Sequence, residues 1–405
     1  MVSFASRFGV YVHFPWCLSK CPYCDFASVV AEVVPHARYR DAIARELARR
    51  AEEHGRPATG VESLYFGGGT PSLWEPACVA ATIETVDRLF GIAPGCEITL
   101  EANPGASDAS RFAALRSAGV NRLSIGVQSF HPRILGGLGR GHTPEEAVAA
   151  YGKARSAGFE NLSLDLIFGG PGQTPGMARA DVEKAIELGP EHLSCYGLTL
   201  EGLAEEVRLA KDVKRGRVQV PDDAAQARMG EMVRERLAAA GYGRYEISNY
   251  ARPGRESRHN TLYWVGGEYV AAGCGAHGFR RTGAGGLRYG NPRKPEAYLA
   301  AVESGGAPEV ERDEISREEL FEERLFLGLR LVEGFDLAAA AAETVGAIPA
   351  ETAGALDRLE AQGLIVREGT RVRCTERGLE YHTEVAVRLL PDERPEKRTL
   401  PIVSG

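Results

Sequence analysis

Three cysteines near the start of the chain are spaced to hold a metal centre. They are Cys17, Cys21 and Cys24, in the segment Cys17-Leu-Ser-Lys-Cys21-Pro-Tyr-Cys24. Iron–sulfur clusters are held by thiolates, usually four for a [4Fe–4S] centre. Three cysteines would leave one iron open to a small molecule that chelates it through an amine and a carboxylate. The alternative is a closed zinc site, which His13 or a distant cysteine could complete.

A glycine-rich turn further along the chain favours the cluster over zinc. Gly67-Gly68-Gly69-Thr70-Pro71-Ser72 directly follows an apolar run that is typical of a strand. Glycines let a backbone approach a ligand closely and expose its N–H and C=O groups. The turn is therefore a second candidate for ligand binding, although a glycine-rich turn alone is a weak signal.

Short apolar runs that alternate with helical patterns must position these residues. The expected strands are 9–14, 63–68, 97–102, 122–128, 161–169 and 192–200. A helical pattern places Tyr39, Ile43 and Leu47 on one face. Strands that alternate with helices predict an α/β fold with a parallel sheet, here a partial (β/α)6 TIM-like barrel. Glu101, Gln128 and Asp165 end apolar runs, where such folds carry functional residues.

The chain is expected to comprise four parts. They are a barrel core at 1–240, an extension at 241–310, a winged-helix-like α+β domain at 311–385, and a mobile tail at 386–405. The third part ends in a pattern of helix, turn, short hairpin and helix. Acidic residues run through it and no basic stripe appears, so we expect a packing or interaction role and no nucleic-acid partner.

The composition agrees with an ordinary globular protein. The 405 residues include 48 Lys and Arg against 55 Asp and Glu, a net charge of −7, so no overall positive field recruits nucleic acid. We expect no signal peptide and no transmembrane segment. Eight cysteines in such a chain predict a reducing cytoplasm and metal ligation in preference to disulfides.

The cysteine spacing and the glycine-rich turn together resemble the radical S-adenosylmethionine (SAM) superfamily. The likeness extends over roughly residues 1–280. Within the superfamily, several segments look like the coproporphyrinogen-dehydrogenase-like group. These are YVHFPWCLSKCPYCDF, FGGGTPS, LEANPG, SIGVQSF, LGRGH, LDLIFGGPGQT and YEISNYARPGRESRHNTLYW.

The resemblance implies a [4Fe–4S] cluster on the three cysteines and SAM as a second cofactor. The SAM contacts it implies are Tyr11, Tyr23, Gly68, Gly69, Thr70, Glu101, Gln128, Arg140 and Asp165. Their chemistry suits the role, because carboxylates accept hydrogen bonds from ribose hydroxyls or an ammonium group and Arg140 can pair with a carboxylate. Read singly, Glu101 or Asp165 could instead cap a helix, and Arg140 could be a solvated surface charge.

Two departures separate the chain from the oxygen-independent coproporphyrinogen oxidases of that group. Phe26 stands where the oxidases have a further cysteine, and only sixteen residues precede Cys17. The segment Arg258-His259-Asn260-Thr261-Leu262-Tyr263-Trp264 instead matches the HNxxYW motif of a heme-chaperone branch. His259 is therefore a candidate heme ligand, since imidazole is a common ligand of heme iron. The alternative is a hydrogen-bonded structural histidine.

We therefore predict a heme chaperone that binds heme and passes it to an acceptor protein, such as a respiratory enzyme at the membrane. The alternative is a catalytic radical enzyme that acts on a tetrapyrrole. A weaker third possibility is a zinc-bound interaction protein. The remaining cysteines lack ligand spacing and are expected to be small core residues. They are Cys78, Cys96, Cys195, Cys274 and Cys374.

Overall fold

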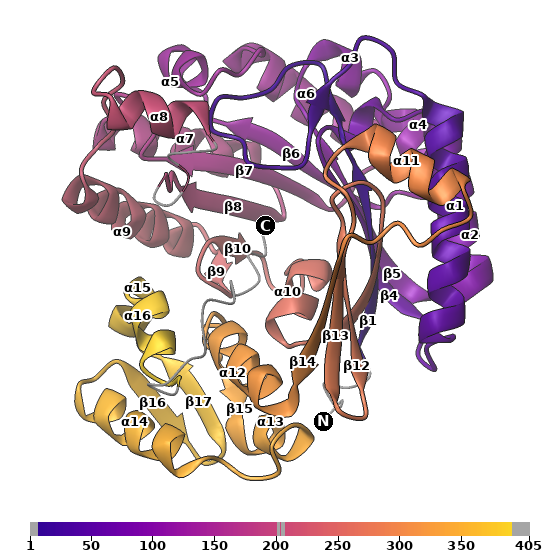
Figure 1. Cartoon of the computed structure of the whole chain (residues 1–405). Coiled ribbons are helices and arrows are strands. Elements are labelled where there is room, and N and C mark those ends of the chain that lie inside the picture. Colours follow the sequence, from indigo (N-terminus) through magenta and orange to yellow (C-terminus); the bar gives the residue numbers. More distant parts are fainter. Residues whose placement is uncertain (1–6, 201–202, 204–206, 391–405) are drawn as a thin grey trace.

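A single curved sheet organises the molecule (Figure 1). The computed structural model describes residues 7–200, 203 and 207–390. In it, twelve strands pair in the order β14-β13-β12-β11-β1-β4-β5-β6-β7-β8-β10-β9. Six neighbouring strands are parallel: β1 (Phe8–Phe14), β4 (Val61–Gly68), β5 (Ile92–Ala102), β6 (Arg122–Gln128), β7 (Leu162–Phe168) and β8 (His192–Gly197). These are the six strands that the sequence predicts.

Helices connect these strands and cover the convex face of the sheet (Figure 1). They are α1 (His36–His54), α2 (Pro76–Phe90), α4 (Phe112–Ser117), α6 (Pro144–Ser156), α7 (Pro175–Leu188) and α9 (Asp223–Ala239). The predicted face of α1 is confirmed, because Tyr39, Ile43 and Leu47 are all fully buried. Shorter elements complete this half: β2 (Trp16–Cys17), β3 (Val29–Val30), α3 (Ala106–Ala109), α5 (Pro132–Gly137) and α8 (Arg208–Lys214).

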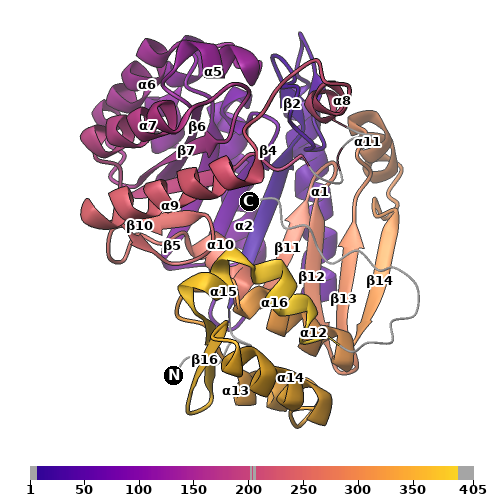
Figure 2. The same cartoon turned by 90° about the vertical axis from the view of Figure 1, so that its left-hand side faces the viewer.

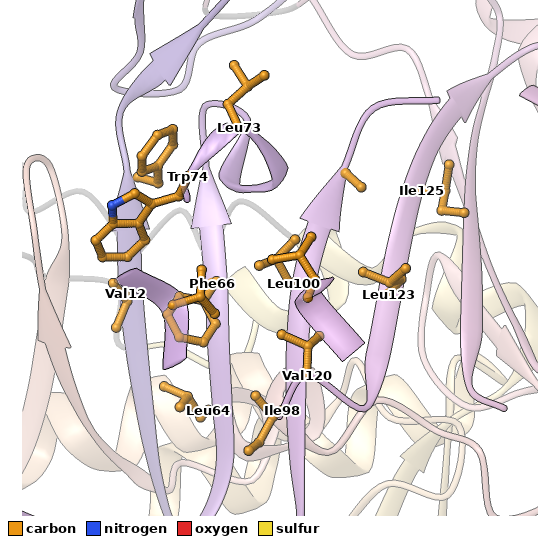
Figure 3. Close-up of a cluster of buried hydrophobic side chains, with 14 of the residues drawn as sticks. Val12, Leu64, Phe66, Leu73, Trp74, Ile98, Leu100, Val120, Leu123 and Ile125 are labelled. Atoms are coloured by element: carbon orange, nitrogen blue, oxygen red, sulfur yellow. The ribbon is translucent and has the colours of Figure 1, made fainter. Parts of the chain in front are cut away.

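The main hydrophobic core lies between these helices and the convex face of the sheet. Figure 3 shows part of it, with apolar side chains from neighbouring strands beside one another and Trp74 at one side of the cluster. Alternate residues along a strand point to opposite faces. The core therefore takes every second strand residue, such as Leu64 and Phe66 on β4 and Leu123 and Ile125 on β6. The five predicted core cysteines are all buried, which confirms that expectation.

The concave face of the parallel strands, which we call the lumen face, is polar. The residues that alternate with the core positions are Ser63 and Tyr65 on β4, Glu97, Thr99 and Glu101 on β5, Arg122 and Ser124 on β6, Ser163 and Asp165 on β7, and His192 and Ser194 on β8. Closed barrels of this class fill their interior with bulky branched apolar side chains. The polar side chains of this lumen face therefore need hydrogen-bond partners from other elements or from ligands.

The extension continues the sheet at both edges. Strand β11 (Glu268–Ala272) pairs in parallel with β1, and β12 (His277–Thr282), β13 (Gly285–Gly290) and β14 (Glu311–Ser316) follow in antiparallel order. At the far edge, β10 (Asn249–Ala251) and β9 (Gly243–Arg244) follow β8. The described strands form an open sheet and not a closed cylinder, which confirms the predicted partial barrel.

A C-terminal unit lies across the concave side of the sheet (Figures 1 and 2). It contains α12 (Arg317–Gly328), β15 (Phe335–Asp336), α13 (Leu337–Glu343), α14 (Ala350–Ala361), β16 (Ile365–Glu368), β17 (Arg371–Cys374), α15 (Glu376–Glu380) and α16 (His382–Val387). Helix α10 (Arg258–Trp264), which carries the HNxxYW motif, contacts both the sheet and α12. Helix α11 (Pro295–Glu303) packs against α1. Residues 391–405 of the predicted tail lie outside the described residues.

No helix in the described part of the chain has the length and apolar character that a membrane crossing requires.

Candidate cofactor site

The three cysteines lie on one loop at the carboxyl end of β1. Cys17 ends β2, which pairs with β3, and a hydrogen bond from Cys24 N to Cys21 O (3.1 Å) closes the turn between the other two. All three thiols are partly exposed. Burial raises the pKa of Cys17 and of Cys24, so both favour the thiol form until a metal or a cation stabilises the thiolate.

Neighbouring side chains already supply hydrogen bonds to these sulfur atoms. The Thr70 hydroxyl donates to Cys17 Sγ (3.5 Å), and Arg140 Nη1 donates to Cys21 Sγ (3.6 Å). Thiolates are the usual ligands of an iron–sulfur cluster. The donor set of three partly exposed thiols with donors around them therefore fits a cluster.

The glycine-rich turn brings the end of β4 against the end of β1. Gly69 N donates to Phe14 O (2.7 Å), and Thr70 N donates to Trp16 O (2.9 Å). A Cβ on Gly68 would lie 2.6 Å from the His13 ring, and Gly68 has φ of +115°. These glycines are required because the two strand ends approach closely. The same approach places Thr70 beside the loop that carries Cys17, Cys21 and Cys24, which we call the cluster loop.

Glu101 lies at the end of β5, beside this turn. Its carboxylate accepts hydrogen bonds from the Tyr65 hydroxyl (2.7 Å) and from Gly68 N (3.1 Å). Burial raises the pKa of Glu101 to about 7, and the nearby Asp165 carboxylate adds to the increase, while the Tyr65 hydrogen bond opposes it. A cation bound near Glu101 would therefore be stabilised, since a nearby positive charge favours the ionised carboxylate and lowers its pKa.

Asp165 lies on the same lumen face, on β7, two strands away from Glu101 on β5. It accepts hydrogen bonds from the hydroxyls of Ser124 (3.0 and 3.1 Å to the two oxygens) and Ser163 (3.3 Å). Burial raises its pKa, and these hydrogen bonds act in the opposite direction. Neither carboxylate caps a helix, which removes the structural alternative considered for them.

Gln128 occupies a strained position at the end of β6. Its φ is +65°, the only positive φ of a non-glycine residue within the described ranges. The pairing of β6 with β7 shifts register between Gly126 and Gln128, so a bulge directs this side chain. Strain of this kind persists where the surrounding structure enforces it, often at a ligand site.

Arg140 and Tyr23 meet beside the cluster loop. Arg140 Nη2 donates to Gly126 O (2.8 Å) and to the Asn103 amide oxygen (2.5 Å), in addition to its bond to Cys21. The pKa of Tyr23 is raised by burial, against an opposing effect of Arg140. The prediction that Arg140 binds a carboxylate stays a prediction, but the residue is no solvated surface charge.

Tyr11 and His259 lie deeper in the lumen, where aromatic rings stack. The His259 ring lies 5.0 Å from the Tyr65 ring and 6.2 Å from the Tyr11 ring, nearly parallel to both. His259 is 1% exposed, its Nδ1 is 2.9 Å from Ser63 Oγ, and its Nε2 is 2.8 Å from the Tyr263 hydroxyl. Burial, with Arg122 nearby, lowers its pKa to about 3.

Both ring nitrogens of His259 are therefore engaged, and ligation of heme iron would require one of these hydrogen bonds to break. Trp264 of the same motif is 4% exposed. The structure brings the cysteines, the glycine-rich turn, Glu101 and Arg140 together at one end of the sheet, and it places His259 further down the lumen. Heme ligation by His259 stays a prediction.

Three residues that connect the site were not predicted. Asn103 donates to Thr70 Oγ1 (3.0 Å) and accepts from Arg140. Tyr65 holds Glu101, and Ser124 holds Asp165. The LEANPG segment contained Asn103, and strand alternation alone places Tyr65 and Ser124 on the lumen face, so both signals were present in the sequence.

Comparisons with known proteins identify the superfamily and the fold. The model of the radical SAM superfamily matches residues 11–188, and the model of the HemN C-terminal domain matches residues 315–381. In structure, the chain is similar to the coproporphyrinogen III oxidase HemN of Escherichia coli, with a TM-score of 0.79 and 22% identity over 95% of this chain and 90% of that one. The fold and the cysteine loop are those of a radical SAM protein.

Relatives in sequence narrow the class. The chain is 38% identical to the heme chaperone HemW of Mycobacterium tuberculosis over 92% of both chains. It is 33% identical to HemW of Bacillus subtilis over 93% of this chain and 97% of that protein, and 42% identical to HemW of Escherichia coli over 67% and 69%. The chain belongs to the HemW family of heme chaperones.

Proposed function

We propose that this protein is a heme chaperone that carries a [4Fe–4S] cluster and SAM, binds heme and transfers it to an acceptor protein. The observation that carries the proposal is the 38% identity to a heme chaperone over 92% of both chains, in a chain with the partly exposed three-cysteine loop. Eight unpaired cysteines suit a protein of the cytoplasm. Such a protein would reach a membrane-bound acceptor from the cytoplasmic side.

The cluster would be held by Cys17, Cys21 and Cys24. The fourth iron would be left for the amine and carboxylate of SAM. When bound, this pair of cofactors can supply one-electron chemistry. The chain itself orients the loop through the hydrogen bonds that Thr70 and Arg140 donate to the sulfur atoms.

The lumen residues would hold SAM. Glu101 and Asp165 present two carboxylates that can accept hydrogen bonds from the amino group and from the ribose hydroxyls of SAM. Gly68, Gly69 and Thr70 shape the turn beside them, Gln128 is directed toward the same end by its bulge, and Tyr11 and Tyr23 supply aromatic surface. In this arrangement the role of Arg140 is to pair with a cofactor carboxylate, while its contact with Cys21 links SAM to the cluster loop.

A radical enzyme that acts on coproporphyrinogen is the second candidate. The structural similarity to HemN shows that the two proteins share a fold. Phe26, which is 36% exposed, stands where the oxidases have a further cysteine. This substitution removes a thiol from the rim of the cluster loop and favours the chaperone.

Two assays on one anaerobic preparation test the proposal. Heme titration should give about one heme per chain, and incubation with coproporphyrinogen III, SAM and a reductant should leave the substrate unchanged. Formation of protoporphyrinogen would support the enzyme instead. Failure of the wild-type protein to bind heme under any condition would reject the chaperone.

A further inference from the structure

His277 differs from the other histidines of the chain in its accessibility. The nine histidines all lie within the described residues, and His277 is the one classed as exposed, with 48% of its side chain accessible. His13, His142, His192, His259 and His382 are buried and hydrogen-bonded. The other three, His36, His54 and His131, are half-buried. A heme-iron ligand needs a nitrogen lone pair that an incoming macrocycle can reach. Accessibility therefore selects His277.

The surroundings of His277 leave its ring uncrowded. It begins β12 opposite Gly290, and a Cβ on Gly290 would lie 2.6 Å from the His277 ring. The absence of a side chain at Gly290 is what makes room for the imidazole. The nearest charged partner is Glu311, whose carboxylate is 4.0 Å from Nδ1. Burial lowers the pKa of His277, with Arg288 and Arg293 acting in the same direction and Glu311 opposing them, so the neutral ring is favoured.

His277 faces the lumen at the end that carries the cofactor site. Alternation places His277 and Phe279 on one face of β12. Phe279 pairs with Tyr269, Tyr269 pairs with Gly9, and Gly9 pairs with Ser63, which bonds to His259 in the lumen. These strand partners lie on the same face, so His277 shares the lumen face with the HNxxYW helix.

The cluster loop borders this position. A Cβ on Gly275, two residues before His277, would lie 2.4 Å from Ala27. Arg293 donates to Asp25 O (2.6 Å) and lies 3.6 Å from the Asp25 carboxylate, and 62% of its side chain is exposed, so it can turn to a second carboxylate. Phe26, between these two loop residues, presents an exposed ring. Imidazole, guanidinium and aromatic ring match the iron, the carboxylates and the apolar face of a heme.

We infer that His277 is the axial ligand of the heme iron, in a heme site at the rim of the cluster loop where Arg293 pairs with a heme carboxylate. This inference rests on the proposed function, because it takes heme as the ligand. The HNxxYW motif then supports the strands that carry His277, because the Tyr263 ring contacts the Tyr269 ring of β11 (4.7 Å between ring centres).

Heme titration of the full-length cluster-loaded protein tests the assignment. His277→Ala should lose the absorption and electron-paramagnetic signature of an imidazole-ligated ferric heme and bind heme at least about tenfold more weakly, or 1.4 kcal/mol. Added imidazole should restore heme affinity in this variant, and affinity is the informative measurement because imidazole alone also ligates ferric heme. His36→Ala, a half-buried histidine elsewhere, should behave like the wild type. Arg293→Ala should weaken binding while keeping the signature.

The outcomes separate the inference from the function on which it rests. If the wild type binds heme and His277→Ala keeps both signature and affinity, the inference is overturned and the chaperone stands. Loss of the signature in His259→Ala but not in His277→Ala would assign the ligand to the HNxxYW motif. A loss of heme affinity in His277→Ala that added imidazole does not restore would also reject iron ligation. A wild type that binds no heme would reject the proposed function itself.

Discussion

The guanidinium of Arg330 lies over the ring of Trp264, 4.2 Å from the ring centre. The same side chain donates to Glu246, a fully buried carboxylate, at 2.9 Å. The C-terminal unit thereby covers the end of α10, the helix that carries the HNxxYW motif. A ligand that reached Trp264 would first have to displace Arg330.

This contact should contribute strongly to stability. Arg330→Ala would leave Glu246 buried without its charged partner, which typically costs about 3 kcal/mol. Chemical denaturation followed by tryptophan fluorescence should show this loss of unfolding free energy. Arg373→Ala, which removes an exposed ion pair with Glu368, should change it by less than about 1 kcal/mol. Equal effects of the two variants would mean that the buried pair contributes no more than a surface pair.

The cluster ligands can be tested by metal analysis. After anaerobic reconstitution, the wild type should hold about four irons and four sulfides per chain. Ala in place of Cys17, Cys21 or Cys24 should abolish this content, because too few thiolates would remain. Cys78→Ala is the matched control, since Cys78 is buried away from the loop. Stoichiometric zinc without sulfide in the wild type would contradict the cluster.

The raised pKa of Glu101 predicts a pH dependence of SAM binding. The carboxylate is ionised above a pKa of about 7 and protonated below it, and only the ionised form can accept hydrogen bonds from the SAM amino group through both oxygens. Affinity measured by calorimetry on cluster-loaded protein should therefore fall about tenfold from pH 8 to pH 6, as the ionised fraction falls. Glu101→Gln should bind weakly with a flat profile. An unchanged pH profile in that variant would assign the dependence to another group.

Asp165 should contribute to the same binding without affecting the cluster. Asp165→Asn replaces a charged acceptor, and hydrogen bonds to charged groups contribute about 1.5–3 kcal/mol, so affinity for SAM should fall about tenfold or more. Asp181→Asn alters a buried carboxylate that bonds to Ser129 outside the lumen, and it should leave SAM affinity unchanged. Equal losses in both would indicate a general structural effect, as would loss of iron in Asp165→Asn.

Gln128 should show a trade between stability and ligand binding. Glycine tolerates a φ of +65° without strain, so Gln128→Gly should raise the unfolding free energy by about 1 kcal/mol. The same variant should bind SAM more weakly, because the directed side chain is lost. Thermal unfolding and calorimetry on the same preparation measure both effects. A variant that is less stable than the wild type would argue against strain at this position.

Much of the fold followed from local patterns in the sequence. The six parallel strands were visible because each is a short apolar run, and the buried face of α1 because Tyr39, Ile43 and Leu47 recur at helical spacing. The pairing of β1 with β11 was not visible, since it joins Phe8–Val12 to residues 268–272 and no local signal records which strand takes a sheet edge.

The candidate site divides in the same way. Cys17, Glu101 and Asp165 could be proposed from the sequence because their types and their places at strand ends are suited to ligand binding. The engagement of both His259 nitrogens was not predictable, because it depends on Ser63, which is far away in sequence and becomes a neighbour through sheet register. A motif defines residue types, whereas the accessibility of a ring nitrogen depends on the tertiary packing around it.

The pairing of β1 with β11 also constrains how the chain is made. Strand β1 leaves the ribosome early, yet the strand that completes its outer edge is more than half the chain behind it. Until β11 is synthesised, the nascent protein exposes an unpaired strand edge, which other chains can pair with and aggregate. Domains generally fold as units during synthesis. The cysteine loop at the end of β1 should therefore acquire its lasting shape only after residue 272 has emerged, so cluster insertion is expected only once about two thirds of the chain has been synthesised.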